Sequence, residues 1–233
     1  MDNFYQDSNR FEVTELTLTS VMARVFLIMG IGLTITGFTA WTVGTNDFLI
    51  NSLYSNPALL IGLMIAELVV VLAFSAMVNK VSHVAGMIMF VVYSLLNGVT
   101  LSFIFLMYVE ASIYSTFLIT AVTFFGMAVF GYTTKKSLHG IGSYLMMGLM
   151  GIIIAGIVNI FFQNDMLSFI ISVIGVVVFV GLTAYDTQRI KERLNAASSD
   201  EEVKRVSVYG ALILYLDFVN LFLKLLRLLG KRR

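Results

Sequence analysis

The 233-residue chain is 58% hydrophobic and only 12% charged, with a net charge of +1 and no cysteine. Soluble domains carry about 25% charged residues, so this composition excludes a water-soluble globule and is typical of a chain embedded in lipid. The small net charge gives no reason to expect a nucleic-acid partner. The lack of cysteine excludes disulfides, cysteine nucleophiles and thiolate metal sites.

Long apolar runs follow a short polar tail, residues 1–20, which lacks the basic start and apolar core of a signal peptide. A spanning helix needs about 20 apolar residues, because each adds about 1.5 Å across a hydrocarbon core of about 30 Å. The continuity of the runs excludes barrel strands, which alternate between faces. We therefore predict one all-helical transmembrane domain, residues 21–233, with seven spans at 21–43, 57–78, 82–108, 113–132, 142–163, 167–187 and 207–229.

Charge alternates between successive connections. Lysine and arginine are concentrated in the loops 79–83, 133–140 and 187–206. The intervening loops have neither and carry Asp47, Glu110 and Asp165. Because basic loops stay in the cytoplasm, we predict a multi-pass protein of a bacterial inner membrane with a cytoplasmic N-terminus. The closing Lys-Arg-Arg conflicts with an outward C-terminus, so the last segment either spans or re-enters, and we favour spanning.

Three acids lie inside the predicted spans, where an ionised group costs about 3 kcal/mol or more at the centre. Asp186, in VGLTAYDTQRIKERL, is near the inner end of the sixth span, with Arg189 as a candidate partner. Asp217, in LILYLDFVNLFLKLL, is about ten residues into the seventh span. Glu67 is midway along the second span. It is either a hydrogen-bonded structural carboxyl or part of an ion path.

The polar residues of the seventh span recur at steps of three and four, so they share one helix face. They are Asp217, Asn220, Lys224, Arg227 and Lys231. So narrow a stripe predicts a face turned to the bundle interior or to water, with an amphipathic helix lying on the membrane surface as the alternative. Asn220 and Tyr215 are candidates for orienting the Asp217 carboxyl, and Asn220 is also a candidate residue of an ion path.

Asp186 and Asp217 are expected to meet, because the sixth span runs inward and the seventh runs back outward. Two carboxylates in a low-dielectric site cannot both ionise at low cost, so they share a proton. The protonated pair would hold the two helices together, and the deprotonated pair would repel or accept a cation. The two residues are therefore predicted to form a proton switch, whose deprotonated form can accept a nearby cation.

The stretches AYDTQRIK, LYLDFVNLF and LLRLLG, with GIVNIF at 156–161, resemble the bacterial branch of the transmembrane Bax inhibitor motif family. The hydropathy profile is similar over nearly the whole chain. The resemblance implies six helices wrapped around a central C-terminal seventh, and a passive calcium leak controlled by a di-aspartyl pH sensor at Asp186 and Asp217. It also implies a pore acid at Glu67 and a latch arginine at the inner end of the second span, where this chain offers only Lys80.

These observations favour a pH-gated calcium or cation leak channel without a cofactor, whose partners are the lipid bilayer, calcium ions and protons. Calcium takes about six to eight oxygens, and a chain with few acids and no EF-hand loop can offer only a weak, partly hydrated site. Two alternatives stay open: a proton-coupled secondary transporter, since buried carboxylates also serve proton relays, and a non-transporting membrane scaffold that regulates other membrane proteins. No HExxH, GxSxG or phosphate-loop motif indicates an enzyme.

Overall fold

The computed structural model describes residues 15–77 and 82–233. Within these ranges the chain forms nine α-helices and no strand, and it contains seven segments long and apolar enough to cross a membrane, which confirms the predicted seven-span helical fold. The helices are α1 (Glu15–Gly44), α2 (Asp47–Tyr54), α3 (Pro57–Met77), α4 (His83–Leu101), α5 (Ile104–Met107), α6 (Glu110–Thr133), α7 (His139–Phe162), α8 (Asp165–Asn195) and α9 (Asp200–Leu229).

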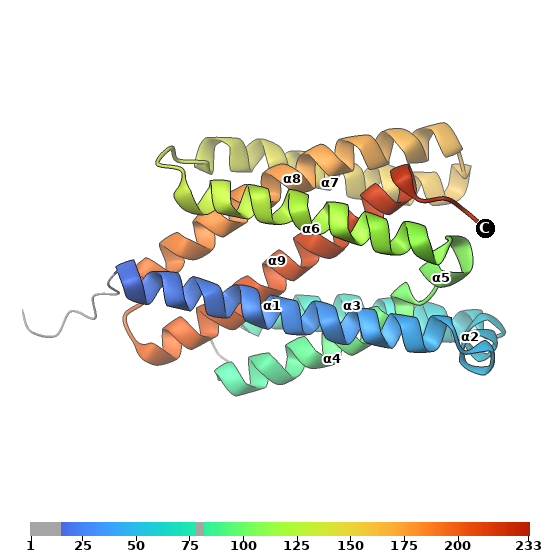
Figure 1. Ribbon diagram of the computed structural model, residues 1–233, viewed down its shortest axis with the longest axis horizontal. Helices are drawn as coiled ribbons and strands as arrows, with labels where there is room; N and C mark the ends of the chain where they lie inside the picture. The colour runs from blue at the N-terminus through green and yellow to red at the C-terminus, as the bar shows by residue number, and fades with distance from the viewer. Residues whose placement is uncertain (1–14, 78–81) are drawn as a thin grey trace, which may run out of the picture.

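The last helix, α9, crosses the bundle obliquely from one end to the other (Figure 1). It packs against α1, α4, α6 and α8, while α3 packs against α4 and α7 packs against α8. The apolar window of α9 is 67% buried, against 6% for the windows of α3 and α7. The most polar of the seven spans is therefore also the one best shielded from lipid.

The two ends of the bundle are named here by the chain termini. At the N-terminal end α1 begins and α8 turns into α9, and the C-terminal end carries α2, α5 and the last residues (Figure 1). The chain end is held there by backbone hydrogen bonds: the Val109 N–H donates to the Lys231 carbonyl at 2.9 Å and the Arg233 N–H to the Met107 carbonyl at 3.0 Å. The last segment therefore traverses the bundle and does not re-enter.

The connection between α8 and α9 is much shorter than the predicted polar loop 187–206, because the helices extend into it from both sides and leave only residues 196–199. The side chain of Ser199 accepts the Glu202 N–H and caps α9, and the acidic residues of the first turn favour a helix N-terminus. The predicted loop was too long because a hydropathy profile records the charge of these residues but not their preference for capping and forming helices.

Two local features of the C-terminal end also differ from the hydropathy prediction. The predicted third span is interrupted between α4 and α5, where the Ser102 hydroxyl donates to the Val99 carbonyl at 2.6 Å and so competes with the helix hydrogen bonds. The predicted loop 44–56 contains the short helix α2, whose N-cap Asn46 accepts two backbone N–H groups.

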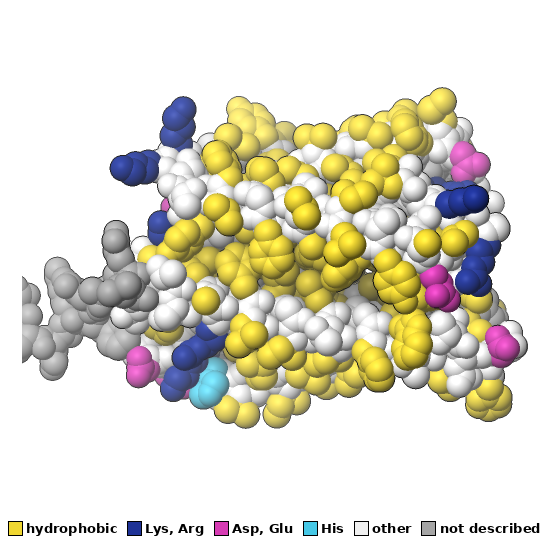
Figure 2. Space-filling model, in the orientation of Figure 1, with side chains coloured by type: hydrophobic (Ala, Val, Ile, Leu, Met, Phe, Trp, Pro, Cys, Tyr) yellow, Lys and Arg dark blue, Asp and Glu magenta, His cyan; other side chains and the backbone are white. Residues whose placement is uncertain are grey.

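The outer surface of the bundle is apolar along its length, and the charged side chains lie at the two ends (Figure 2). Large side chains such as Phe161, Val122 and Tyr144 are 75% exposed or more. A surface of this kind is stable only against hydrocarbon, so the protein is a multi-pass membrane protein.

Candidate proton-sensing site

Asp186 on α8 and Asp217 on α9 lie side by side where the two helices pack together. The two residues are only 8% and 5% exposed, and their carboxyl groups are close enough to interact directly. Two buried carboxylates so close together repel each other when both are ionised, so the arrangement favours a proton on one of them. The pair is therefore suited to sharing a proton between two helices.

Packing around the pair leaves it little exposed. Thr183, Thr187 and Leu214, which are near neighbours in sequence, are completely buried. On the other side of α8, the backbone of Gly131 on α6 lies directly against the backbone of Ala184, with no room for a side chain. The third helix, α6, therefore fixes the part of α8 that carries Asp186.

One oxygen of the pair is unsatisfied. Asp217 Oδ2 is buried and, among the described residues, has no hydrogen-bond partner. A buried acceptor without a partner costs about 1–3 kcal/mol. The free oxygen is thus an acceptor that a water molecule or a cation can satisfy.

Two residues of the polar stripe on α9 face α8. Asp217 lies against Asp186, and about two turns further along the apolar stem of Lys224 lies over Gly175 of α8. Asn220, between them, donates its side-chain N–H to the Leu216 carbonyl of its own helix at 2.8 Å. This part of the predicted stripe is therefore a helix–helix contact, whereas Arg227 and Lys231 are exposed and Lys231 lies beyond the end of α9.

A narrow crevice between α8 and α9 leads from Asp186 past two arginines. Asp186, Arg189, Arg193 and Tyr209 all line it. Both arginines attract the Asp186 carboxylate, but in residues 82–233 neither comes within 4 Å of it to form an ion pair. Arg189 therefore acts on Asp186 through space. Lys80, the candidate latch, lies outside the described residues.

Glu67 on α3 belongs to a different polar cluster, shared with α4 and α9. Its carboxyl accepts a hydrogen bond from the Thr100 hydroxyl and one from Asn97 Nδ2 at 3.4 Å. The Asn97 Oδ1 atom in turn accepts from the Tyr215 hydroxyl at 2.9 Å. Three spans are thus joined by one continuous chain of hydrogen bonds.

This series of hydrogen bonds extends to α1. The Tyr215 hydroxyl lies 2.6 Å from the Thr36 hydroxyl, which donates to the Ser94 carbonyl at 2.9 Å. Tyr215 is completely buried, and these contacts tie it to Glu67, whereas we had predicted that it orients Asp217. Sequence reasoning missed Thr36 and Asn97. The sequence did contain a signal for Asn97, because an amide side chain inside a span is costly unless it is hydrogen-bonded.

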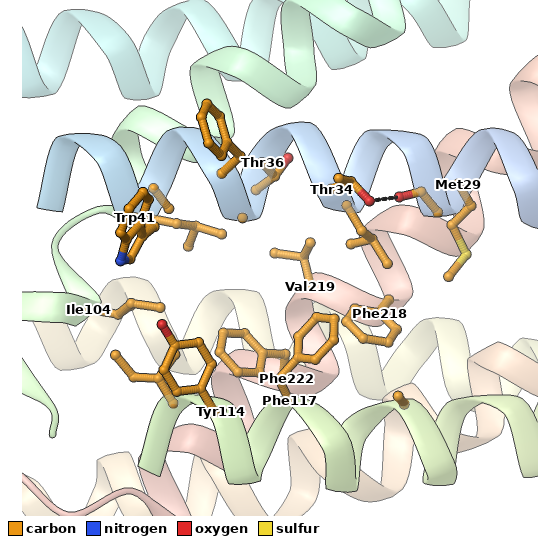
Figure 3. A pocket seen from close by; sticks show the side chains of 18 of the residues that line it. Met29, Thr34, Thr36, Trp41, Ile104, Tyr114, Phe117, Phe218, Val219 and Phe222 are labelled. Atoms are coloured by element: carbon orange, nitrogen blue, oxygen red, sulfur yellow. Dashed lines mark hydrogen bonds between the residues drawn. The ribbon is translucent and has the colours of Figure 1, made fainter. Parts of the chain in front are cut away.

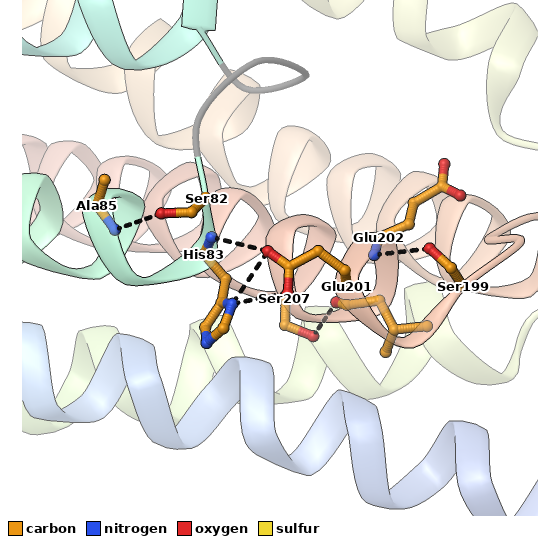
Figure 4. Close-up of polar contacts among 8 residues, drawn as sticks. Ser82, His83, Ala85, Ser199, Glu201, Glu202 and Ser207 are labelled. Atoms are coloured by element: carbon orange, nitrogen blue, oxygen red, sulfur yellow. Dashed lines mark hydrogen bonds and ion pairs between the residues drawn. The ribbon is translucent and has the colours of Figure 1, made fainter.

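Two histidines make polar contacts at the N-terminal end. His83, at the start of α4, meets Glu201, at the start of α9: the Nδ1 atom is 3.0 Å from one carboxylate oxygen and the backbone N–H donates to the other (Figure 4). His139 Nε2 is 2.8 Å from a carboxylate oxygen of Glu192. Both histidines are partly exposed, and each is paired with a glutamate.

The capacity for a metal ion is limited. In the part of the chain that the structure describes, no three histidine, cysteine or acidic side chains are grouped to hold one. Asp186 and Asp217 would supply at most part of the six to eight oxygens, roughly, that calcium takes. Water would have to supply the rest.

Comparison with known proteins identifies the family of this chain. The chain matches the family described as "Inhibitor of apoptosis-promoting Bax1" over residues 18–233. It belongs to the Bax inhibitor family. This confirms the resemblance predicted from the two aspartate motifs.

Relatives within the Bax inhibitor family match the chain along nearly its whole length. "Inner membrane protein YbhL" of Escherichia coli (strain K12) is 45% identical over 219 residues, which cover 93% of each chain. An uncharacterized protein of Borreliella burgdorferi is 47% identical over 213 residues, covering 91% of this chain and 92% of the relative. An uncharacterized protein of Rickettsia prowazekii is 39% identical over 216 residues. None of these three names states an activity.

Proposed function

We propose that this member of the Bax inhibitor family is a pH-gated leak channel for calcium and other cations, with Asp186 and Asp217 as its proton switch. The observation that carries the proposal is the close approach of these two buried carboxyl groups, one on each of two neighbouring spans. Because two buried carboxylates cannot both ionise at low cost, the contact is most favourable while one of them is protonated. The contact between α8 and α9 therefore depends on pH.

Loss of the proton makes the closed pair unfavourable. Two unit charges about 4 Å apart repel by about 4 kcal/mol at an effective dielectric constant of about 20. The repulsion is relieved either when α8 and α9 separate or when a cation enters between the carboxylates. The unsatisfied Asp217 Oδ2 gives such a cation an oxygen ligand that no protein group occupies.

Glu67 couples to the same switch through α9. Tyr215 and Asp217 are two residues apart on this helix, and Tyr215 reaches Glu67 through Asn97. A movement of α9 that separates the two aspartates also disturbs the hydrogen bonds that fix the Glu67 carboxylate. Glu67 is thus a further acid on the proposed ion path, and its hydrogen bonds break when the two aspartates separate.

The proposed location is the inner membrane of a bacterium, as the printed name of the Escherichia coli relative states for that protein. The basic residues Lys135 and Lys136 lie in the α6–α7 connection at the N-terminal end of the bundle, which by the positive-inside bias faces the cytoplasm. Since the chain has no cysteine, single variants report the orientation. A membrane-impermeant maleimide added to intact cells should label Asp47→Cys and leave Lys136→Cys unlabelled; the reverse pattern would invert the topology.

The decisive experiment is calcium flux into liposomes that contain the purified protein, measured at equal internal and external pH from about pH 5 to pH 8. Wild-type flux should change with pH, and Asp186→Asn and Asp217→Asn should both flatten this dependence. Asp165→Asn, which removes an exposed acid from the first turn of α8, is the matched control and should behave like wild type.

The same assay separates the two alternatives. A proton-coupled transporter would accumulate calcium against its gradient when a proton gradient is imposed, and a leak would not. A scaffold would give no flux at any pH. Either result, or unaltered pH dependence in both asparagine variants, would overturn the proposed function.

A further inference from the structure

A large apolar cavity opens between α1 and α6, and we call it the α1–α6 cavity (Figure 3). Its volume of about 600 Å³ is in the range of small-molecule binding sites. Its lining residues come from five helices, with α1 and α6 forming its sides and α9 its floor. They include Met29, Trp41, Ile104, Tyr114, Phe117 and Phe222.

The cavity opens sideways, toward lipid. At the N-terminal end α1 and α6 are in contact, because the hydroxyls of Thr19 and Tyr132 lie 3.0 Å apart and the rings of Phe26 and Phe125 have their centroids 6.0 Å apart. Beyond these contacts a hydrophobic recess lies between the two helices (Figure 2). Both helices are lipid-facing spans with strongly exposed outer side chains, such as Leu118. The occupant therefore enters from the bilayer.

The lining suits a hydrocarbon chain. Inside the cavity the hydroxyls of Thr34 and Thr36 each already donate to a backbone carbonyl, at 2.8 Å and 2.9 Å. The other polar groups of the lining, the Trp41 indole N–H and the Tyr114 hydroxyl, lie nearer the C-terminal end (Figure 3), where amphipathic rings usually mark the membrane surface. A polar ligand deep in the cavity would lose its hydration and gain few partners, whereas an acyl chain has no hydrogen bonds to lose.

A fixed group of cations lies beside this end of the cavity. The last three residues run along the segment 107–112, directly before the cavity-lining residues of α6, and the Lys231 N–H donates to Ser112 Oγ at 3.1 Å. Arg233 pairs with Glu110 at 3.8 Å. Lys231 and Arg232 are exposed and, within the described ranges, form no ion pair. These cations lie at the end opposite to the basic loops, where the positive-inside bias disfavours them.

We infer that the α1–α6 cavity and the basic chain end form a binding site for one anionic phospholipid. An acyl chain fills the cavity, and the headgroup phosphate lies against Lys231 and Arg232. The surrounding bilayer supplies this ligand, and a phospholipid combines the two chemistries that the site presents, hydrocarbon beside a fixed positive charge. The backbone hydrogen bonds that anchor the chain end hold the basic residues next to the cavity.

The only tryptophan of the chain, Trp41, lines the cavity and reports on it directly. The protein is reconstituted into phosphatidylcholine vesicles containing rising fractions of phosphatidylglycerol brominated on its acyl chains, and Trp41 quenching is measured. Each basic side chain near an anionic headgroup strengthens binding about fivefold. Half-maximal quenching should therefore need at least about fivefold less brominated phosphatidylglycerol than brominated phosphatidylcholine.

Matched variants test the two halves of the site. Lys231→Gln with Arg232→Gln should abolish the preference for phosphatidylglycerol, while Lys135→Gln with Lys136→Gln, at the other end of the bundle, should keep it. Gly30→Leu fills the cavity from a position with open space around it and should also abolish the preference.

The control for Gly30→Leu is Gly151→Leu on α7, which also adds a side chain into open space but lies outside the cavity. It should leave quenching unchanged. Equal quenching by the two brominated lipids in the wild type would mean that the cavity holds bulk lipid or a second copy of the chain, and would overturn the inference. So would a preference that survives removal of Lys231 and Arg232.

Discussion

Replacing Asp217 by asparagine should remove the contribution of the Asp186–Asp217 pair to the pH dependence of stability. In the proposed mechanism the folded wild type holds a proton between Asp186 and Asp217, and the unfolded chain releases it above about pH 4. Since the folded state binds more protons, wild-type stability must fall as the pH rises. In Asp217→Asn the amide donates to Asp186 without a titrating proton, so the hydrogen bond persists at every pH.

The difference in unfolding free energy between Asp217→Asn and wild type follows from the repulsion between two ionised carboxylates in the closed pair. At the acid end of the range the variant should be within about 1 kcal/mol of wild type, because one hydrogen bond replaces another. At the alkaline end it should be the more stable protein, by an amount bounded by the repulsion of about 4 kcal/mol that it avoids. Asp217→Leu should be less stable than Asp217→Asn at every pH, because it leaves Asp186 buried without a partner.

The measurement is thermal unfolding of purified protein in detergent, followed by helical circular dichroism from about pH 5 to pH 8. Asp165→Asn serves as the control for removal of one exposed acid. If wild-type stability stays constant over this range, or if Asp217→Asn follows the wild-type curve, the two carboxyl groups do not share a proton and the reasoning is wrong.

Three further substitutions test the surrounding contacts. Tyr215→Phe removes the hydroxyl that links α9 to α1 and α4 and should cost about 1–3 kcal/mol in unfolding measurements, whereas Tyr144→Phe, at a site 75% exposed, should cost little. Gly131→Leu inserts a side chain against the backbone of α8 and should destabilise by about 1–3 kcal/mol or more, while Gly126→Leu, which enters open space, should be neutral. Glu67→Gln keeps a hydrogen-bonding group but loses the charge, so calcium flux should fall while unfolding stays within about 1 kcal/mol of wild type. An unchanged flux would remove Glu67 from the ion path.

The extents of α8 and α9 show the limit of reasoning from hydropathy. The pattern located both spans and the residues that carry charge within them, because apolar length and the cost of burying charge are properties of single segments. It could not show that the charged stretch around residues 187–206 continues both helices, since capping and helix propensity act independently of hydropathy.

The sequence by itself determined the seven spans, the polar face of the last one and the presence of two aspartates on neighbouring spans, because the bilayer imposes these constraints segment by segment. Only the tertiary structure decided which partners those groups have. It joined Asp186 to Asp217, directed Tyr215 toward Asn97 and Thr36, and left the α1–α6 cavity beside the basic chain end. Side-chain direction and helix crossing depend on how whole helices pack against one another, and no single segment encodes them.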